Sequence, residues 1–222
     1  MSELPTDPKA RLMAAIHSAP SQTRKAARVS AWLILPAGVI IAAALYFAFD
    51  GIEHGKGRAL WFYVACAVSW TAVAAVSLWG ALGRARASSW RSGSSLLAFA
   101  LGTPAVLFAT MFFFAVADPD VTTIHPEKIG WKCLGLTLAA AAFPLVGLLY
   151  AKRESDPVHP SFTGAALGSA CGAAAGIMVE LWCPVAAPRH VAFGHILPIV
   201  VLTGLGALLG ARVLGLRRPP RR

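Results

Sequence analysis

Hydrophobic residues occur in six long stretches that are separated by short polar connections. Each stretch is close to the ~20 residues that a helix needs to cross ~30 Å of hydrocarbon. Backbone amides find no water in hydrocarbon and must bond within their own segment, so each stretch is expected to be a helix. The pattern predicts an all-α membrane protein, a bundle of six transmembrane helices at residues 30–49, 59–82, 96–117, 133–151, 162–181 and 196–214.

The positive charges fall on alternate connections. Most of the 20 Lys and Arg residues lie at the two chain ends or in the second and fourth connections. Because cytoplasmic connections carry an excess of Lys and Arg, both termini are predicted to be cytoplasmic, and the first, third and fifth connections to face outward. The five exceptions, all on the outward side, are Lys56, Arg58, Lys128, Lys132 and Arg189.

Composition supports this interpretation. A hydrophobic fraction of 57% excludes an ordinary soluble domain. The net charge of +10 would by itself suggest nucleic acid or anionic lipid as a partner. Since the surplus lies on the predicted cytoplasmic side, we interpret it as a topology signal, and the basic tail 215–222 as a contact with membrane lipid. No direct contact with nucleic acid and no cleavable signal peptide are expected.

The predicted domains are a cytoplasmic N-terminal segment 1–29, a transmembrane domain 30–214 and the tail 215–222. In the first of these, Leu12, Met13 and Ile16 lie on one face of a short predicted helix, beside Lys9 and Arg11. So short a helix is marginal in water, so it is expected to order on a partner or on anionic lipid.

Glycines recur every four residues in the fifth predicted span. A ridge without side chains lets another helix approach closely, so this span is expected at the centre of the bundle, against the sixth or another span. Dimerisation through the same ridge is the competing use. The ridge comprises Gly164, Gly168, Gly172 and Gly176.

No catalytic constellation is present. The chain lacks a phosphate-binding glycine loop, a His-Glu-x-x-His pair and a Gly-x-Ser-x-Gly elbow, so it is not expected to be an enzyme. A charged residue in mid-span, which a proton-coupled transporter normally needs, is also missing. Glu180 comes closest, and it is expected at the outer end of the fifth span, within reach of water.

The cysteines fall into two kinds. Cys66 and Cys171 lie inside predicted spans, where a cysteine is typically a small buried hydrophobe. Cys133 begins the fourth span and Cys183 follows the fifth, so both belong to the outer membrane boundary. In a bacterium this boundary faces the oxidising periplasm, where two nearby thiols can form a disulfide.

His190 and His195 share this outer region with the two cysteines. Thiolate and imidazole together form a ligand set for soft metals. A structural disulfide, a redox switch, a metal-sensing site at Cys133, Cys183, His190 and His195, and unpaired thiols therefore all stay open. The histidines could also be ordinary interfacial residues. No resident cofactor is expected, and a soft metal ion would act as a signal.

These features resemble the NrsF-type membrane anti-sigma factors. The resemblance rests on the short N-terminus before six spans, on Cys133 and Cys183, and on a C-terminal pattern. That pattern reads Glu-Leu-Trp-Cys-Pro at 180–184, Pro188 and His190, Gly-His-Ile-Leu-Pro at 194–198 and Gly-Ala-Leu-Leu-Gly-Ala-Arg at 206–212.

The resemblance implies an inner-membrane repressor that holds an extracytoplasmic-function sigma factor and releases it on an envelope, metal or photooxidative stress. The two outward cysteines would be its sensors. The N-terminal segment matches no motif, so Leu12, Met13, Ile16, Lys9 and Arg11 are assigned to sigma binding by their amphipathic pattern alone. The alternatives are a small-molecule or metal-ion permease and a structural subunit of a membrane complex.

Overall fold

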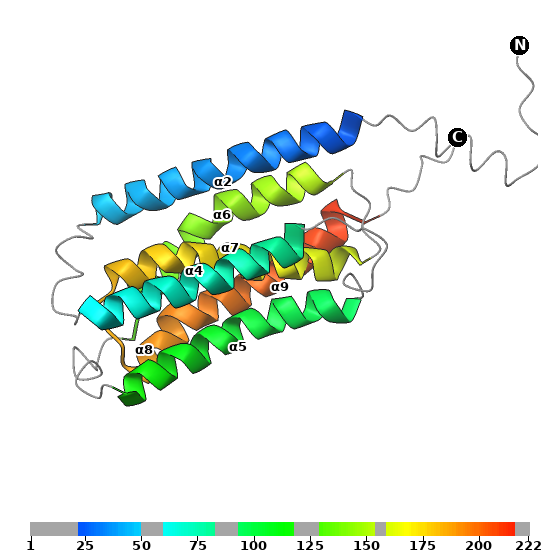
Figure 1. Ribbon diagram of the computed structural model, residues 1–222. Coiled ribbons are helices and arrows are strands. Elements are labelled where there is room, and N and C mark those ends of the chain that lie inside the picture. Colours follow the sequence, from blue (N-terminus) through cyan, green and yellow to red (C-terminus); the bar gives the residue numbers. More distant parts are fainter. Residues whose placement is uncertain (1–21, 50–59, 83–92, 118–128, 154–158, 216–222) are drawn as a thin grey trace, which may run out of the picture.

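The computed structural model describes residues 22–49, 60–82, 93–117, 129–153 and 159–215, with side chains from residue 33 onward. These ranges contain helices and no strand, which confirms the all-α class. Figure 1 shows the long helices side by side in one bundle. The elements are α2 (Gln22–Ala48), α4 (Leu60–Leu82), α5 (Gly93–Ala117), α6 (Trp131–Lys152), α7 (Pro160–Trp182), α8 (Pro188–Val191), the π-helical turn η3 (Ala192–Ile196) and α9 (Leu197–Val213).

Within the described ranges, five helical segments are long and apolar enough to cross a membrane. They are α4, α5, α6, α7 and the continuous run of α8, η3 and α9. This indicates a multi-pass membrane protein. In α2 the apolar part with described side chains, Leu33–Ala48, is shorter, so the first of the six predicted spans stays a prediction. The amphipathic helix expected before it lies outside the described residues.

Two helices begin eight residues earlier than hydropathy predicted. Helix α2 starts at Gln22, so the last part of the predicted cytoplasmic segment 1–29 is helical. The final helical run starts at Pro188, well before the predicted residue 196. Proline suits the first position of a helix because its missing N–H would have no partner there. The predicted start of the sixth span at residue 196 was therefore wrong, because a helix can extend beyond its apolar stretch.

Helix α7 lies at the centre of the bundle (Figure 1). In its most apolar window 83% of the residues are buried, against 28–44% in the other four membrane-length segments. It contacts α2, α4, α5, α6 and α9. A helix made largely of Gly and Ala can be surrounded in this way because its neighbours approach close to its backbone.

The glycine ridge of α7 packs within the chain. A Cβ added at Gly164 or Gly168 would collide with backbone carbonyls of α9, at Gly206 and Leu202 respectively. Further along, Gly172 meets Ile199, and Gly176 accommodates the indole ring of Trp70 from α4. The ridge is therefore occupied by α9 and α4, which leaves it no surface for the dimer contact considered from the sequence.

Helix α2 lies at the edge of the bundle and packs mainly against α6 (Figure 1). Gly38 approaches Pro144, and Ile34 fills the space beside Gly147. At the end of α2, the indole Nε1 of Trp182 donates a hydrogen bond of 2.7 Å to the carbonyl of Phe49. This bond joins the edge helix to the last residue of the central helix.

Candidate functional site

Four side chains of types that can ligate a metal meet at one end of the bundle. Cys133 lies in the first turn of α6, Cys183 follows the last residue of α7, His190 lies in α8, and His195 lies in η3. All four are buried, with exposed fractions between 0% and 3%. Residues fifty positions apart are thus brought together where α6 begins and α7 ends. We call them the thiol–imidazole cluster.

The cluster is compact. The Nε2 atom of His190 lies 3.3 Å from Sγ of Cys133 and 3.1 Å from Sγ of Cys183. One ligand atom from each of the four residues lies within 4.8 Å of all the others. Neither cysteine is in a disulfide in this structure, so the geometry is that of a ligand set.

Two glycines let α6 reach the cluster. Gly130 precedes α6 with a φ of 101°, a left-handed conformation that favours glycine. A Cβ at this position would lie 2.9 Å from Cα of Gly194 in η3. A Cβ at Gly194 would lie 3.1 Å from Cβ of Cys133. The absence of both side chains therefore allows Cys133 to approach the histidine-bearing turn.

The π-helical turn aligns the two histidines. His190 and His195 are five positions apart, which in a regular α-helix would separate their directions by about 140°. A π-helical turn bonds residues five apart, and here the N–H of Leu197 bonds to the carbonyl of Ala192. The centroids of the two rings lie 5.4 Å apart. Such turns are frequent at functional sites.

Glu180 supports the cluster from α7. Its Oε2 atom lies 2.9 Å from Nδ1 of His195, and the carboxylate is only 1% exposed. The expectation that Glu180 reaches water was therefore wrong. The cause is that α8 and η3 fold back over the end of α7 and cover it. Its position three residues before Cys183, near the end of α7, was the signal for its role.

The cluster changes the acidity of Cys183. Hydrogen bonding with Cys133, and further contacts with His190 and His195, lower the pKa of the Cys183 thiol. Burial acts in the opposite direction but is outweighed. The environment therefore favours the thiolate, which is the form that binds metals and attacks as a nucleophile.

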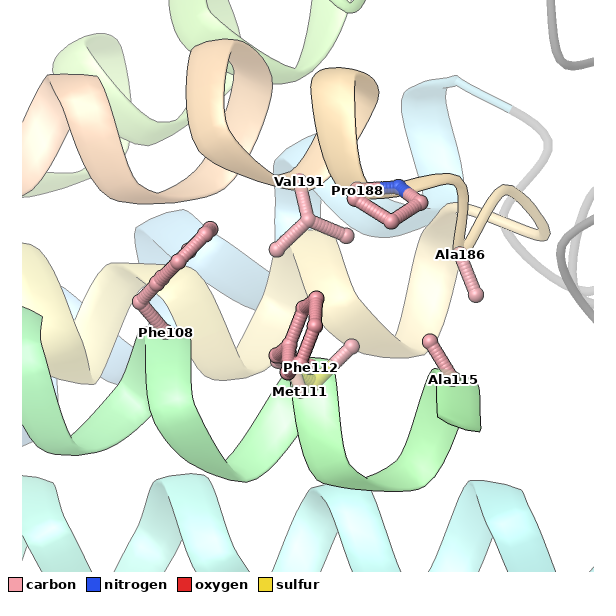
Figure 2. A pocket seen from close by; sticks show the side chains of 7 residues that line it. All are labelled: Phe108, Met111, Phe112, Ala115, Ala186, Pro188 and Val191. Carbon is pink, nitrogen blue, oxygen red and sulfur yellow. The ribbon is translucent and has the colours of Figure 1, made fainter. Parts of the chain in front are cut away.

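A shallow hollow near the cluster is lined by nonpolar residues. Figure 2 shows side chains of α5 on one side and of the segment 186–191 on the other. This packing holds the segment that carries His190 against α5. The lining residues are Phe108, Met111, Phe112, Ala115, Ala186, Pro188 and Val191.

The other predicted site residues lie either outside the described part of the chain or in the core. The sigma-binding residues Leu12, Met13, Ile16, Lys9 and Arg11 lie outside the described residues, as does most of the basic tail. The ridge glycines lie in the core, away from the cluster end except for Gly176. Cys66 and Cys171 are buried thiols in α4 and α7, as expected. Sequence reasoning missed Gly130 and Gly194.

Fold and site together define a multi-pass, all-helical membrane protein with a buried soft-ligand cluster at one end. The chain belongs to the NrsF family, described as negative regulator of sigma F, whose family model matches residues 14–215. This match confirms the family resemblance read from the sequence. The family name denotes negative regulation of a sigma factor. Comparisons with curated proteins and with solved structures gave no match.

Proposed function

We propose that the chain is a bacterial inner-membrane anti-sigma factor. In the resting state it holds an extracytoplasmic-function sigma factor at the cytoplasmic face, and it releases this partner when a stress signal reaches the opposite side. The observation that carries the proposal is the match of residues 14–215 to a family of negative regulators of a sigma factor. Neither nucleic-acid binding nor an enzymatic step is part of the proposed mechanism.

The charge distribution supports an orientation. Six spans with both termini in the cytoplasm would put the cluster end on the periplasmic side, because the outward connections carry few Lys and Arg residues. The thiols would then meet metals and oxidants before these enter the cell. The start of α2 at Gln22 would lie at the cytoplasmic face, directly after the segment proposed to bind sigma.

Sigma binding is assigned to the N-terminal segment. Leu12, Met13 and Ile16 would enter an apolar groove of the sigma factor, as amphipathic helices commonly do. Lys9 and Arg11 beside them would favour the encounter with an acidic partner surface. The segment would order on its partner, since a helix this short is marginal alone.

The path from the signal to this segment runs through α2. Trp182 is adjacent to Cys183 and binds the carbonyl that ends α2. The 27 residues of α2 extend about 40 Å, which is enough to reach the other face. A shift of Cys183 would therefore act on α2 through Trp182. The signal must bind the releasing state more tightly than the retaining state, because only differential binding shifts such an equilibrium.

Deletion of residues 1–21 tests the proposal, since it removes the assigned segment and leaves α2 intact. In cells with a sigma-dependent reporter, expression should rise at least about tenfold, which corresponds to a loss of about 1.4 kcal/mol of binding. Immunoblotting of membranes verifies insertion, and deletion of residues 216–222 serves as the control. Unchanged reporter activity with altered solute uptake would instead favour a permease.

A further inference from the structure

We propose that Cys133, Cys183, His190 and His195 form a closed, four-coordinate site for a zinc-group cation, Zn²⁺ or Cd²⁺, in which Glu180 is the positioning residue for His195. This inference deepens the proposed function by naming the chemistry of the ligand that the cluster receives. It rests on that function only for the consequence of binding. The site itself is argued from the geometry of the cluster.

The spacing of the ligand atoms fits a tetrahedral site. With metal–sulfur bonds of about 2.3 Å and metal–nitrogen bonds of about 2.0 Å, ligand atoms in a tetrahedron lie about 3.3–3.8 Å apart. The two measured sulfur–nitrogen distances around His190 are 3.3 Å and 3.1 Å. All four ligand atoms lie within 4.8 Å of one another. Shifts of a few tenths of an ångström to about 1 Å would complete the coordination.

The donor types select the class of cation. Two sulfurs and two imidazole nitrogens in tetrahedral array suit Zn²⁺ and its heavier congener, whereas Ca²⁺ and Mg²⁺ require oxygen ligands. Four protein ligands leave no open position for water or substrate, which is the arrangement of binding sites and not of catalytic ones. The burial of all four residues keeps competing water out.

Glu180 gives His195 its orientation. With Nδ1 of His195 facing the carboxylate at 2.9 Å, the other ring nitrogen, Nε2, is the one left for the metal. Within the described part of the chain Nε2 makes no hydrogen bond, and the close contact of Nδ1 with Glu180 is an ion-pair contact without hydrogen-bond geometry. Metal-binding histidines typically donate their second N–H to a carboxylate, which fixes the tautomer and raises the basicity of the ligand.

The binding step balances without a redox partner. The sulfurs bind as thiolates and the imidazoles as neutral rings, so any proton held on a ligand atom passes to solvent as two metal–sulfur and two metal–nitrogen bonds form. The two thiolates neutralise the dication, and the N–H of His195 stays with Glu180. A disulfide between Cys133 and Cys183 would use only the sulfurs, and it would leave the convergence of both imidazoles and of Glu180 without a role.

The test uses the full-length chain, purified in detergent with a phosphine reductant and titrated with Co²⁺ and Zn²⁺. Co²⁺ should bind at one ion per chain, with thiolate charge-transfer absorption and the visible bands of tetrahedral cobalt. Binding of the first cation should release protons, and Zn²⁺ should then displace Co²⁺. A folded chain that binds neither cation, or cobalt spectra that are octahedral, would overturn the site.

Variants assign the individual roles. Cys133→Ser and Cys183→Ser should each remove part of the charge-transfer band, and His190→Gln should alter the visible bands. Glu180→Gln should retain one ion per chain but weaken its affinity 10–100-fold, with unchanged helical content. Cys171→Ala, which removes a buried thiol away from the cluster, is the matched control and should bind as the parent does. Equal affinities for Glu180→Gln and the parent would exclude the positioning role.

The two proposals fail in different measurements. Metal binding without any effect of residues 1–21 on the sigma-dependent reporter would leave the site standing and contradict the proposed function. Sigma retention in a chain that binds no cation would leave the proposed function standing and contradict the metal site. If Zn²⁺ or Cd²⁺ binds the parent chain but alters sigma retention equally in the parent and in Cys183→Ser, the cation acts elsewhere and the link between site and release is wrong.

Discussion

Helices α7 and α2 represent two ways of using an apolar sequence. Helix α7 is built from small residues and is buried on nearly all sides, so its surroundings are fixed by contacts with backbone. Helix α2 carries large apolar residues such as Val39, Ile40 and Phe47 that remain 65–68% exposed in the bundle, where lipid would cover them. The comparison shows that hydropathy alone does not distinguish a central helix from an edge helix, whereas residue size does.

The two helices also differ in how freely they can move within the bundle. A helix whose neighbours touch its backbone cannot rotate or slide without collisions, because interiors are close-packed. A helix held mainly by one neighbour and by one hydrogen bond at its end meets fewer such barriers. The central helix thus suits a fixed support for the cluster, and the edge helix suits a movable connection.

The largest effect is expected from removing Trp70, the ring that lies against Gly176 of α7. Trp70→Ala should destabilise the bundle by about 3–5 kcal/mol, since the cavity beside α7 cannot collapse fully. Thermal unfolding in detergent measures the change. Phe47→Ala in α2 is the matched control and should cost far less, because that ring is 65% exposed. Equal losses would contradict the contrast between the helices.

A smaller effect is expected from adding a single methyl group to each helix. Gly168→Ala should cost about 1–3 kcal/mol, because its Cβ collides with a backbone carbonyl of α9 that cannot move aside. Gly38→Ala in α2 places the Cβ 3.4 Å from Pro144, so little loss is expected. Both changes raise helix propensity equally. Denaturation curves that shift alike for the two variants would show that α7 has room to adjust.

The smallest change in stability is expected at the connection between the two helices. Trp182→Phe removes the hydrogen bond to Phe49 and should cost only about 0.5–1.5 kcal/mol. It should nevertheless loosen the end of α2, which hydrogen exchange of the amides near residue 48 would detect. Trp79→Phe, at a ring that is 80% exposed, is the control. Unchanged exchange in Trp182→Phe would remove α2 from the proposed signalling path.

Hydropathy was sufficient to predict which stretches are helical, because it is a local property, but it missed the start of the last helix. The orientation derived from charge stays a prediction. The positions of Cys133 and Cys183 at one end of the bundle followed from the order of the spans. Distances between side chains are tertiary and were not predictable. The sequence could name Cys133, Cys183, His190 and His195 as a candidate ligand set, but it could not show that their ligand atoms lie within 4.8 Å of one another.

Glu180 shows where the reasoning from sequence was misleading. A carboxylate at the end of a span is ordinarily solvated, so its burial beneath α8 and η3 was not expected. The fold-back depends on Gly130 and Gly194, whose contact joins segments more than sixty residues apart. No periodic pattern marks such a contact. The π-helical turn likewise has the same apolar composition as the helix that follows it.

The π-helical turn η3 amounts to one surplus residue accommodated within a helix that otherwise runs from Pro188 to Val213. Excision of a single amino acid there would restore regular α geometry and bring His190 and His195 to a spacing of four, at which their directions differ by only about 40°. Regular α geometry at the present length would instead separate the two directions by about 140°, so that His190 would face away from the two sulfurs while α9 kept its register. The convergence of the four ligands thus depends on one additional residue accommodated as a π-helical turn. Substitution of single residues would not reveal this dependence.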